Sequence, residues 1–393
     1  MGSNVTDPPK LYAETPCIPS PELSREAGCN IYLKLENLQP SGSFKIRGIG
    51  SLMSHALLSS GAGRAHFYCS SGGNAGLACA EAARSLRQPC DVFVSVLTPD
   101  HVLAKLVALG ATPHRAGNSW PEADEHCQAA VARDADGVYV PPFDHPLIWE
   151  GNASLVDELA VLEAEGIFAG NPGSSGAIDA IVCSVGGGGL LNGLMEGVER
   201  NYGSSSASHG AIAGSERVGH RRRPAVLAIE TAGADSLAAS IRAGSHVAIP
   251  AMTSVATSLG APRVAAQTYQ WAKACNASTF TTTSGSISNS MPSMPRAHGA
   301  TSGDTTRLIS AVVSDAEAVS ACVRFLDDAR LLVEVACGAT LSSAYSGGAL
   351  LRAALGRGMD DETWACMNIV MVVCGGSSIS MDMLGKYRME FGV

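Results

Sequence analysis

The chain has 393 residues, 46% of them hydrophobic, which is enough for two globular domains with substantial cores. Its net charge of -9 argues against a nucleic-acid-binding protein, because such proteins need a basic surface. No apolar run is long enough to cross a membrane, and the first twenty residues lack the apolar core of a signal peptide. We therefore expect a cytoplasmic protein without nucleic-acid or membrane partners.

The twelve cysteines are scattered without a Cys-x-x-Cys pair, and many fall in apolar segments. This distribution favours reduced, buried thiols over a disulfide framework or a zinc site. The first residues, Met-Gly-Ser-Asn-Val-Thr, match the N-myristoylation pattern, but no polybasic segment follows them. The pattern alone therefore does not indicate a lipid anchor.

Strand and helix patterns alternate through the first part of the chain, after an N-terminal arm and a strand at 31–35. Such alternation predicts a parallel sheet with helices on its faces. The expected strands here are 64–69, 91–96, 112–115 and 138–140, and the expected helices are 46–53, 76–86, 100–109 and 120–132.

The run Pro-Pro-Phe-Asp-His-Pro at 141–146 interrupts the pattern and indicates a crossing between domains. A second alternating block follows it. Its expected strands are 177–185, 225–230 and 368–374, and its expected helices are 151–165, 190–202, 236–243, 264–274, 316–334 and 340–355. We therefore predict an α/β protein with a large domain, residues 1–39 and 145–393, and a small domain, residues 40–144.

Two segments, 203–224 and 275–306, are rich in Ser, Thr, Gly, Ala and Pro and lack apolar periodicity. Because such a composition buries little apolar surface, we expect both to be mobile insertions in the large domain.

Lys45 follows the polar turn Pro-Ser-Gly-Ser-Phe and precedes a helical pattern. A lone lysine in such a place is usually a solvated surface residue. The alternative is a Schiff-base lysine, whose amine becomes nucleophilic when it is desolvated. Other segments have to agree before the second interpretation is preferred.

Two loops join an expected strand to an expected helix and are rich in small residues. The loop Ser70–Gly76 lets backbone N–H groups converge on an anion, and Asn74 adds a side-chain donor and acceptor. The loop of four glycines, 186–189, suits a phosphate, but it fits neither Gly-x-Gly-x-x-Gly nor the Walker motif. It therefore suggests a phosphate that belongs to neither a dinucleotide nor ATP.

Cys374 ends an apolar strand pattern, where a polar side chain can meet a ring nitrogen, although a buried cysteine is more often only a core residue. A reactive lysine, a phosphate loop and a neutral hydrogen-bonding group together match pyridoxal 5'-phosphate (PLP). Its aldehyde needs an amine, its phosphate needs amides, and its pyridine nitrogen needs a partner.

The chain resembles the fold type II PLP enzymes, the fold of the tryptophan synthase β-subunit, and in particular the eukaryotic-type cytosolic L-serine/L-threonine dehydratases. The resemblance runs from about Thr15 to Ser380. It is carried by the segments Pro40–Gly50, Ser70–Gly76, Pro142–Asp144, Leu147–Gly151, Ser184–Leu191, Ala336–Ala339 and Val373–Ser377. It implies two domains, each an open, mostly parallel twisted sheet flanked by helices, with PLP in the cleft between them.

The resemblance also implies roles for individual residues. Lys45 would hold the cofactor and act as the catalytic base, with Phe44 against the ring. Asn74 would bond the ring hydroxyl and Cys374 would face the pyridine nitrogen. The phosphate-binding amides would come from Gly186, Gly187, Gly188, Gly189 and Leu190, and the substrate carboxylate would meet Ser71, Gly72 and Asn74.

A monovalent cation site, with K⁺ as the candidate ion, is a further implication of the resemblance. Its ligands, mostly main-chain oxygens, would be Gly186, Glu230, Ala234, Leu259 and Ala261. Hard oxygen ligands suit a hard cation, but the residue types do not say which one binds.

Three residues depart from the family pattern: Val335 replaces a usual Pro, Ser378 a common Asn, and Gly72 the Ala of more active serine dehydratases. In family members that racemise serine, a Ser stands at the position of Gly72. The third departure therefore bears on the substrate pocket.

The implied activity is β-elimination from L-serine, and from L-threonine, giving pyruvate or 2-oxobutanoate and ammonia, as in amino-acid catabolism that feeds gluconeogenesis. The implied assembly is a homodimer. Three alternatives stay open: a biosynthetic threonine dehydratase, a serine racemase, and a PLP- or amino-acid-binding protein without turnover. Only 13 residues follow Ser380, which disfavours the regulatory domain of the first alternative.

Overall fold

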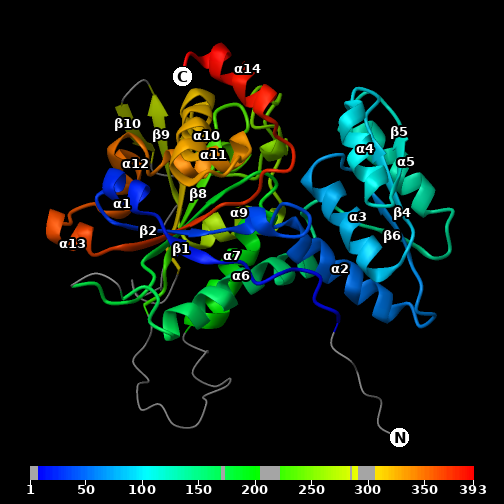
Figure 1. Ribbon diagram of the computed structural model, residues 1–393, viewed down its shortest axis with the longest axis horizontal. Coiled ribbons are helices and arrows are strands. Elements are labelled where there is room, and N and C mark those ends of the chain that lie inside the picture. The colour runs from blue at the N-terminus through cyan, green and yellow to red at the C-terminus, as the bar shows by residue number, and fades with distance from the viewer. Residues whose placement is uncertain (1–7, 170–172, 204–221, 284–285, 291–305) are drawn as a thin grey trace, which may run out of the picture. The chain divides into compact units, whose positions relative to one another are not determined.

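The structure is a computed structural model that describes residues 8–169, 173–203, 222–283, 286–290 and 306–393 (Figure 1). The chain forms two compact units. The smaller consists of residues 1–14 and 38–152, and the larger of residues 15–37 and 153–393.

The smaller unit is built on a four-stranded sheet in which every neighbouring pair is parallel, in the order β5-β4-β3-β6. Its strands are β3 (His66–Cys69), β4 (Cys90–Val94), β5 (Thr112–Arg115) and β6 (Gly137–Tyr139). Its helices are α2 (Lys45–Ser59), α3 (Asn74–Leu86), α4 (Asp100–Ala108), α5 (Trp120–Val131) and the first part of α6 (Pro146–Ala164).

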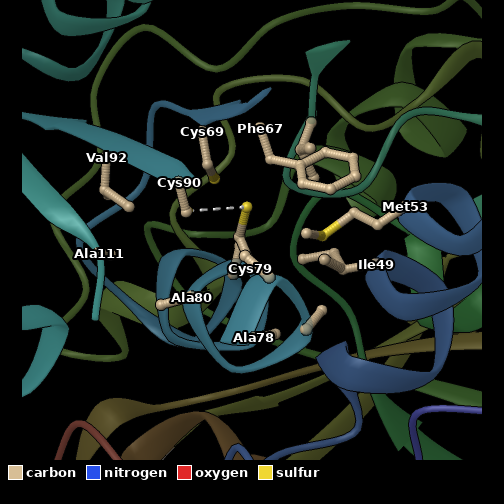
Figure 2. Close-up of a cluster of buried hydrophobic side chains, with 14 of the residues drawn as sticks. Ile49, Met53, Phe67, Cys69, Ala78, Cys79, Ala80, Cys90, Val92 and Ala111 are labelled. Carbon is tan, nitrogen blue, oxygen red and sulfur yellow. Dashed lines mark hydrogen bonds between the residues drawn. The ribbon is translucent and has the colours of Figure 1, made fainter. Parts of the chain in front are cut away.

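The core of the smaller unit lies where α2 and α3 pack beside β3 and β4 (Figure 2). Alanines and Cys79 of α3 meet Phe67 and Cys69 of β3, and the Sγ atoms of Cys79 and Cys90 lie 3.6 Å apart. Small side chains on α3 let this helix approach the sheet closely, which fixes where its first residue, Asn74, lies.

The larger unit is built on an eight-stranded sheet in the order β1-β2-β12-β7-β8-β11-β9-β10. The six inner strands are parallel, and the two edge strands run antiparallel to their neighbours. The strands are β1 (Cys17–Pro19), β2 (Asn30–Lys34), β7 (Ala180–Ser184), β8 (Ala225–Thr231), β9 (Ser278–Thr283), β10 (Ser286–Ser290), β11 (Leu308–Val313) and β12 (Asn368–Val372). Strands β7 and β12 are buried along their whole length, which explains their nearly continuous apolar sequences.

Helices pack on this larger sheet and on one another. Helix α11 contacts β7, β8 and β12, while α10 packs on α11 and α14, and α7 contacts β7, β8 and α9. The helices are α1 (Pro21–Ala27), the rest of α6, α7 (Gly189–Tyr202), α8 (Ser236–Ala243), α9 (Ala266–Ala274), α10 (Asp315–Ala329), α11 (Val335–Ser342), α12 (Ala349–Leu355), α13 (Asp361–Ala365) and α14 (Met381–Phe391). The short 3-10 helices among the described residues are η1 (Glu36–Leu38), η3 (Thr257–Leu259) and η4 (Ser346–Gly348).

The predicted fold class is confirmed, because two mostly parallel sheets are each flanked by helices. The units differ from the expected domains at their edges, since residues 8–14, 38–39 and 145–152 belong to the smaller unit. These segments belong to the smaller unit because they pack on α2 and on the turn that precedes it. Ala13 pairs with Gln39 and accepts a bond from Arg47, and a Cβ at Gly48 would lie 2.5 Å from the Ile148 carbonyl oxygen.

The expectation of a mobile insertion at 275–306 is wrong for its first half. There β9 and β10 form an antiparallel pair that extends the sheet beyond β11. Their Ser- and Thr-rich sequence lacks apolar alternation because β10 is exposed along its length. Residues 204–221 and 291–305 lie outside the described residues.

Two other sequence expectations failed in the larger unit. Strand β11 was missed, although it pairs with β8 and β9 inside the sheet, because it directly follows the expected insertion. The helix expected at 340–355 is broken into α11 and α12, because Gly347 and Gly348 adopt φ of 71° and 62°.

Candidate active site

Lys45 is the first residue of α2 and is half-buried. The turn before it is closed by a 2.7 Å hydrogen bond from Gly42 N–H to the Gln39 carbonyl, and Gly42 has a φ of 76°, which glycine adopts without strain. The Lys45 Nζ donates to the Pro142 carbonyl oxygen at 2.7 Å and lies 5.4 Å from the centre of the Phe44 ring. The amine is therefore held by the Pro-Pro segment that precedes α6.

Close packing of α2 on the first turns of α6 fixes this arrangement. The two helices approach each other closely at Gly151 of α6 and at Gly48 of α2. A Cβ at Gly151 would lie 2.4 Å from the Arg47 carbonyl oxygen, and a Cβ at Gly48 would meet Ile148 just as closely. The side chain of Arg47 is fully buried under the helix start. Lys45 therefore stands on a rigid element, as a catalytic group requires.

The loop from Ser71 to Asn74 connects β3 to α3, and all four of its residues are half-buried. Its shape requires glycine at position 76, where a Cβ would lie 1.7 Å from the Ser71 carbonyl oxygen. Asn74 is the first residue of α3, so the predicted carboxylate-binding loop does lie at a helix N-terminus. At Gly72 a Cβ would come within 3.1 Å of Val94 Cγ1.

Asp124 of α5 anchors the start of this loop, and no sequence motif points to this role. Its Oδ1 accepts the Ser70 hydroxyl at 2.6 Å and the Tyr139 hydroxyl at 2.5 Å. The carboxylate thereby ties the ends of β3 and β6 together. Hydrogen bonding to Asp124, together with the larger effect of burial, raises the pKa of Tyr139 well above its ordinary value.

In the larger unit the four glycines join β7 to α7, so the predicted loop does precede a helix. Gly188 has a φ of 91°, and a Cβ there would lie 2.0 Å from Thr268 Oγ1. The carbonyl of Gly187 accepts the Ala265 N–H at 2.9 Å. Leu190, the second residue of α7, is buried.

This loop has the form of an anion cradle. Its backbone turns too tightly for any side chain at 188, and it leads directly into the N-terminus of α7, where the N–H groups of a helix point toward an anion. Thr268 also stabilises this loop, because its hydroxyl donates to Asn192 Oδ1 of α7 at 2.8 Å.

Cys374 and the glycine loop lie at the same end of two neighbouring strands, because β12 and β7 are parallel. Its side chain is 7% exposed, and its Sγ accepts the Ser184 hydroxyl at 3.5 Å. A further hydrogen bond joins it to the Cys337 thiol, whose pKa is raised by burial and by that bond. The Cys374 thiol is thus placed beside the residues that lead into the glycine loop.

The residues expected to bind a cation lie in three segments of the larger unit: the glycine loop with Gly186, the end of β8 and the turn after it with Glu230 and Ala234, and the η3 region with Leu259 and Ala261. A Cβ at Gly186 would be 2.9 Å from Leu259 Cα, so these two main chains are in contact. Ala261 donates its N–H to the Leu259 carbonyl at 2.7 Å, and Ala234 donates to the Thr231 carbonyl at 2.9 Å.

Glu230 is fully buried, and its two carboxylate oxygens accept the N–H groups of Leu237 and Ala238, both at 2.8 Å. Burial raises the pKa of this carboxyl to about 8. Over the described ranges, no group of three or more His, Cys, Asp or Glu side chains is arranged to hold a metal ion. The expected ligands are mostly main-chain oxygens, which is a different kind of site.

The part of the chain that the structure describes contains no helix that combines the length and the apolar character needed to span a membrane.

Comparison with known proteins identifies the family. The family model of pyridoxal-phosphate dependent enzymes matches residues 9–375. The chain belongs to the pyridoxal-phosphate dependent enzymes. It is 38% identical to the L-serine dehydratase/L-threonine deaminase of Bos taurus, over 98% of this chain and 97% of that protein. It is 39% identical to the serine dehydratase-like protein of Mus musculus, over 97% of this chain and 95% of that protein.

A solved structure agrees with these relatives. The fungal L-serine ammonia-lyase from Rhizomucor miehei is 30% identical, and the alignment covers 97% of this chain and 99% of that one with a TM-score of 0.75. The likeness therefore extends over both units of this pyridoxal-phosphate dependent enzyme.

The residues present fit the cofactor that the family implies. The cradle at Gly188 leaves no room for a side chain and presents helix-start amides, which suits a phosphate. Cys374 offers a thiol for a ring nitrogen, and Lys45 offers an amine that donates to the Pro142 carbonyl. Sequence reasoning found these three groups, but it missed the supporting contacts of Asp124, Ser184 and Thr268.

Proposed function

We propose that this pyridoxal-phosphate dependent enzyme dehydrates L-serine, and also L-threonine, to pyruvate or 2-oxobutanoate with release of ammonia. The observation that carries the proposal is its identity of 38% to an L-serine dehydratase/L-threonine deaminase over nearly the whole of both chains. A lysine on a rigid helix start and an anion cradle, as described above, support it further.

The proposed roles divide between binding and proton transfer. Amides of the 186–190 loop bind the phosphate, Asn74 bonds the ring hydroxyl, and Ser71, Gly72 and Asn74 receive the substrate carboxylate. PLP, when bound, withdraws electrons from the α-carbon of the amino acid, which makes its proton removable. The Lys45 amine takes that proton, and Phe44 limits the space beside the ring.

Loss of the β-hydroxyl completes the elimination. The bond from the β-carbon to oxygen breaks, the hydroxyl leaves as water with one proton, and the released enamine hydrolyses to the keto acid and ammonia. Cys374 favours this outcome because a neutral thiol at the pyridine nitrogen makes a weaker electron sink than a carboxylate would. Prompt elimination then competes well with side reactions such as transamination.

Lys45→Ala is the direct test. The variant should lose pyruvate formation from L-serine by about 10³-fold or more, because it removes the base from the reacting centre. Pyruvate is measured by a coupled dehydrogenase assay, and retained PLP by absorbance after gel filtration. Full activity in Lys45→Ala would refute the proposal, whereas PLP binding without pyruvate in the unmodified protein would indicate a binding protein without turnover.

We further propose a homodimer in the cytoplasm and a monovalent cation at the Gly186, Glu230, Ala234, Leu259 and Ala261 loops. Support for the cytoplasm comes from the twelve cysteines, all of which are free thiols. The dimer rests on the resemblance to the dehydratases. Light scattering tests it, and a mass of one chain would contradict it.

A further inference from the structure

Glu334 is a buried acidic residue that none of the proposed roles uses. It immediately precedes α11 and is 6% exposed. Its Oε2 accepts the Ser258 hydroxyl at 2.5 Å, and its Oε1 accepts the Ser378 N–H at 2.9 Å. One carboxylate therefore joins two loops that lie far apart in the sequence.

The first of these loops lies behind the phosphate cradle. Ser258 belongs to η3, and the next residue, Leu259, is in main-chain contact with Gly186. Any movement of Ser258 would therefore be transmitted through Leu259 to the start of the glycine loop.

The second loop is the one that carries the thiol. Ser378 lies four residues after Cys374, and the Glu334 N–H also donates to the Gly375 carbonyl at 3.3 Å. A Cβ at Gly376 would lie 2.5 Å from the Leu332 carbonyl oxygen, so the loop packs directly on the segment before Glu334. Glu334 thus bonds the thiol loop through both its backbone and its side chain.

We propose that Glu334 is a positioning residue for the cofactor, which fixes the spacing between the Cys374 loop and the phosphate cradle. This inference rests on the proposed function, since it takes the roles of Cys374 and of the glycine loop from it. A purely structural role would not call for a carboxylate, because burying one is costly unless both oxygens are bonded, and an apolar residue fills such a space at lower cost. Here each oxygen accepts a bond from a different loop.

The test compares two carboxylates that bond backbone N–H groups next to the same strand. Asp179, whose side chain is 8% exposed, accepts the Asn368 N–H at 2.9 Å at the start of β12. Glu334 instead accepts the Ser378 N–H, which lies beyond the end of the same strand. Both Glu334→Ala and Asp179→Ala should lower the thermal midpoint of the cofactor-free protein. Only Glu334→Ala should weaken PLP binding, by about 10-fold, as loss of an outer-shell partner does at metal sites.

Two further variants keep the test decisive if Glu334→Ala does not fold. Glu334→Gln should keep PLP affinity within about 3-fold, because its amide can accept from Ser378 and donate to the Ser258 hydroxyl. Ser258→Ala removes one end of the bridge and should weaken PLP about 3-fold, with no additional loss in the Glu334→Ala background. PLP affinity is measured by quenching of protein fluorescence during titration of the cofactor-free enzyme.

The inference is overturned if Glu334→Ala and Ser258→Ala bind PLP as Asp179→Ala does while losing only stability. It is also overturned if Glu334→Gln is as impaired as Glu334→Ala, because the charge and not the bridge would then matter. Failure of the proposed function is a separate result, namely an unmodified protein that neither binds PLP nor forms pyruvate.

Discussion

Gly72 is the residue at which the structure bears most directly on the outcome of the reaction. In the proposed mechanism Lys45 serves one face of the reacting α-carbon, and racemisation needs a second acid on the opposite face. Glycine supplies none. The Cβ direction at Gly72 is crowded, with Val94 Cγ1 at 3.1 Å and Thr98 Cγ2 at 3.3 Å, so any side chain here must displace these neighbours slightly.

Gly72→Ser is expected to add D-serine formation to a protein that makes little of it, because a fixed hydroxyl is better placed than a water molecule to return a proton. The variant should also lose about 1 kcal/mol of stability through the crowding at Val94. Chiral chromatography after incubation with L-serine measures the product. Gly73→Ser is the matched control, since a Cβ there meets only Ser71 Oγ at 3.8 Å.

Abundant D-serine from the unmodified protein would contradict this account and favour a racemase, with another residue as the acid. D-serine from Gly73→Ser at the level of Gly72→Ser would show that the position of the hydroxyl is not what matters.

At the scale of elements, the order of the strands explains which site residues meet. Strands β7 and β12 are parallel neighbours, so Ser184, the last residue of β7, and Cys374, just after β12, lie at the same end of the strands and form a hydrogen bond. The alternating sequence predicted parallel strands, which end on the same side of a sheet, but it did not predict that these two strands are neighbours. It was not sufficient to predict β9 and β10, whose polar composition matches that of an insertion although β9 pairs with β11.

Phe280 tests whether β9 is an integral part of the sheet. Its side chain is 7% exposed, and its backbone pairs with Ala311 of β11. Phe280→Ala should therefore cost about 3 kcal/mol of unfolding free energy. Ile287→Ala in β10 is the control, because that side chain is 36% exposed and should change stability by only about 0.5 kcal/mol. Urea unfolding followed by circular dichroism gives both values, and equal, small losses would mean that β9 contributes little.

At the scale of the whole molecule, the proposed roles divide between the two units. The smaller unit carries the lysine and the carboxylate loop, and the larger unit carries the phosphate cradle, the thiol and the cation loops. The groups with characteristic local sequences could be predicted, as with Lys45 and the glycine loop. The supporting contacts could not, because they depend on distant pairs such as Glu334 with Ser258, which are 76 residues apart, or Asp124 with Ser70, which are 54 apart.

The proposed cation would connect the loops of the larger unit. The main chains of Gly186 and Leu259 already touch, and the carboxylate of Glu230 lies buried at the end of β8, the strand beside β7. A cation bound by their oxygens would brace the phosphate cradle, so replacing potassium with lithium should lower the rate of pyruvate formation several-fold. Lithium is too small for ligands spaced to hold a larger ion.

Choline chloride at equal ionic strength separates this effect from general screening, because choline is too large to enter such a site. We expect choline and lithium to give similarly low rates, and potassium to raise both the rate and the thermal midpoint. In Glu230→Gln the potassium effect on the midpoint should shrink, because a bound cation favours the ionised form of the buried Glu230 carboxyl and the amide has no ionised form. Identical rates in the three salts would remove the cation from the mechanism, and the Gly186–Leu259 contact would then support the cradle without an ion.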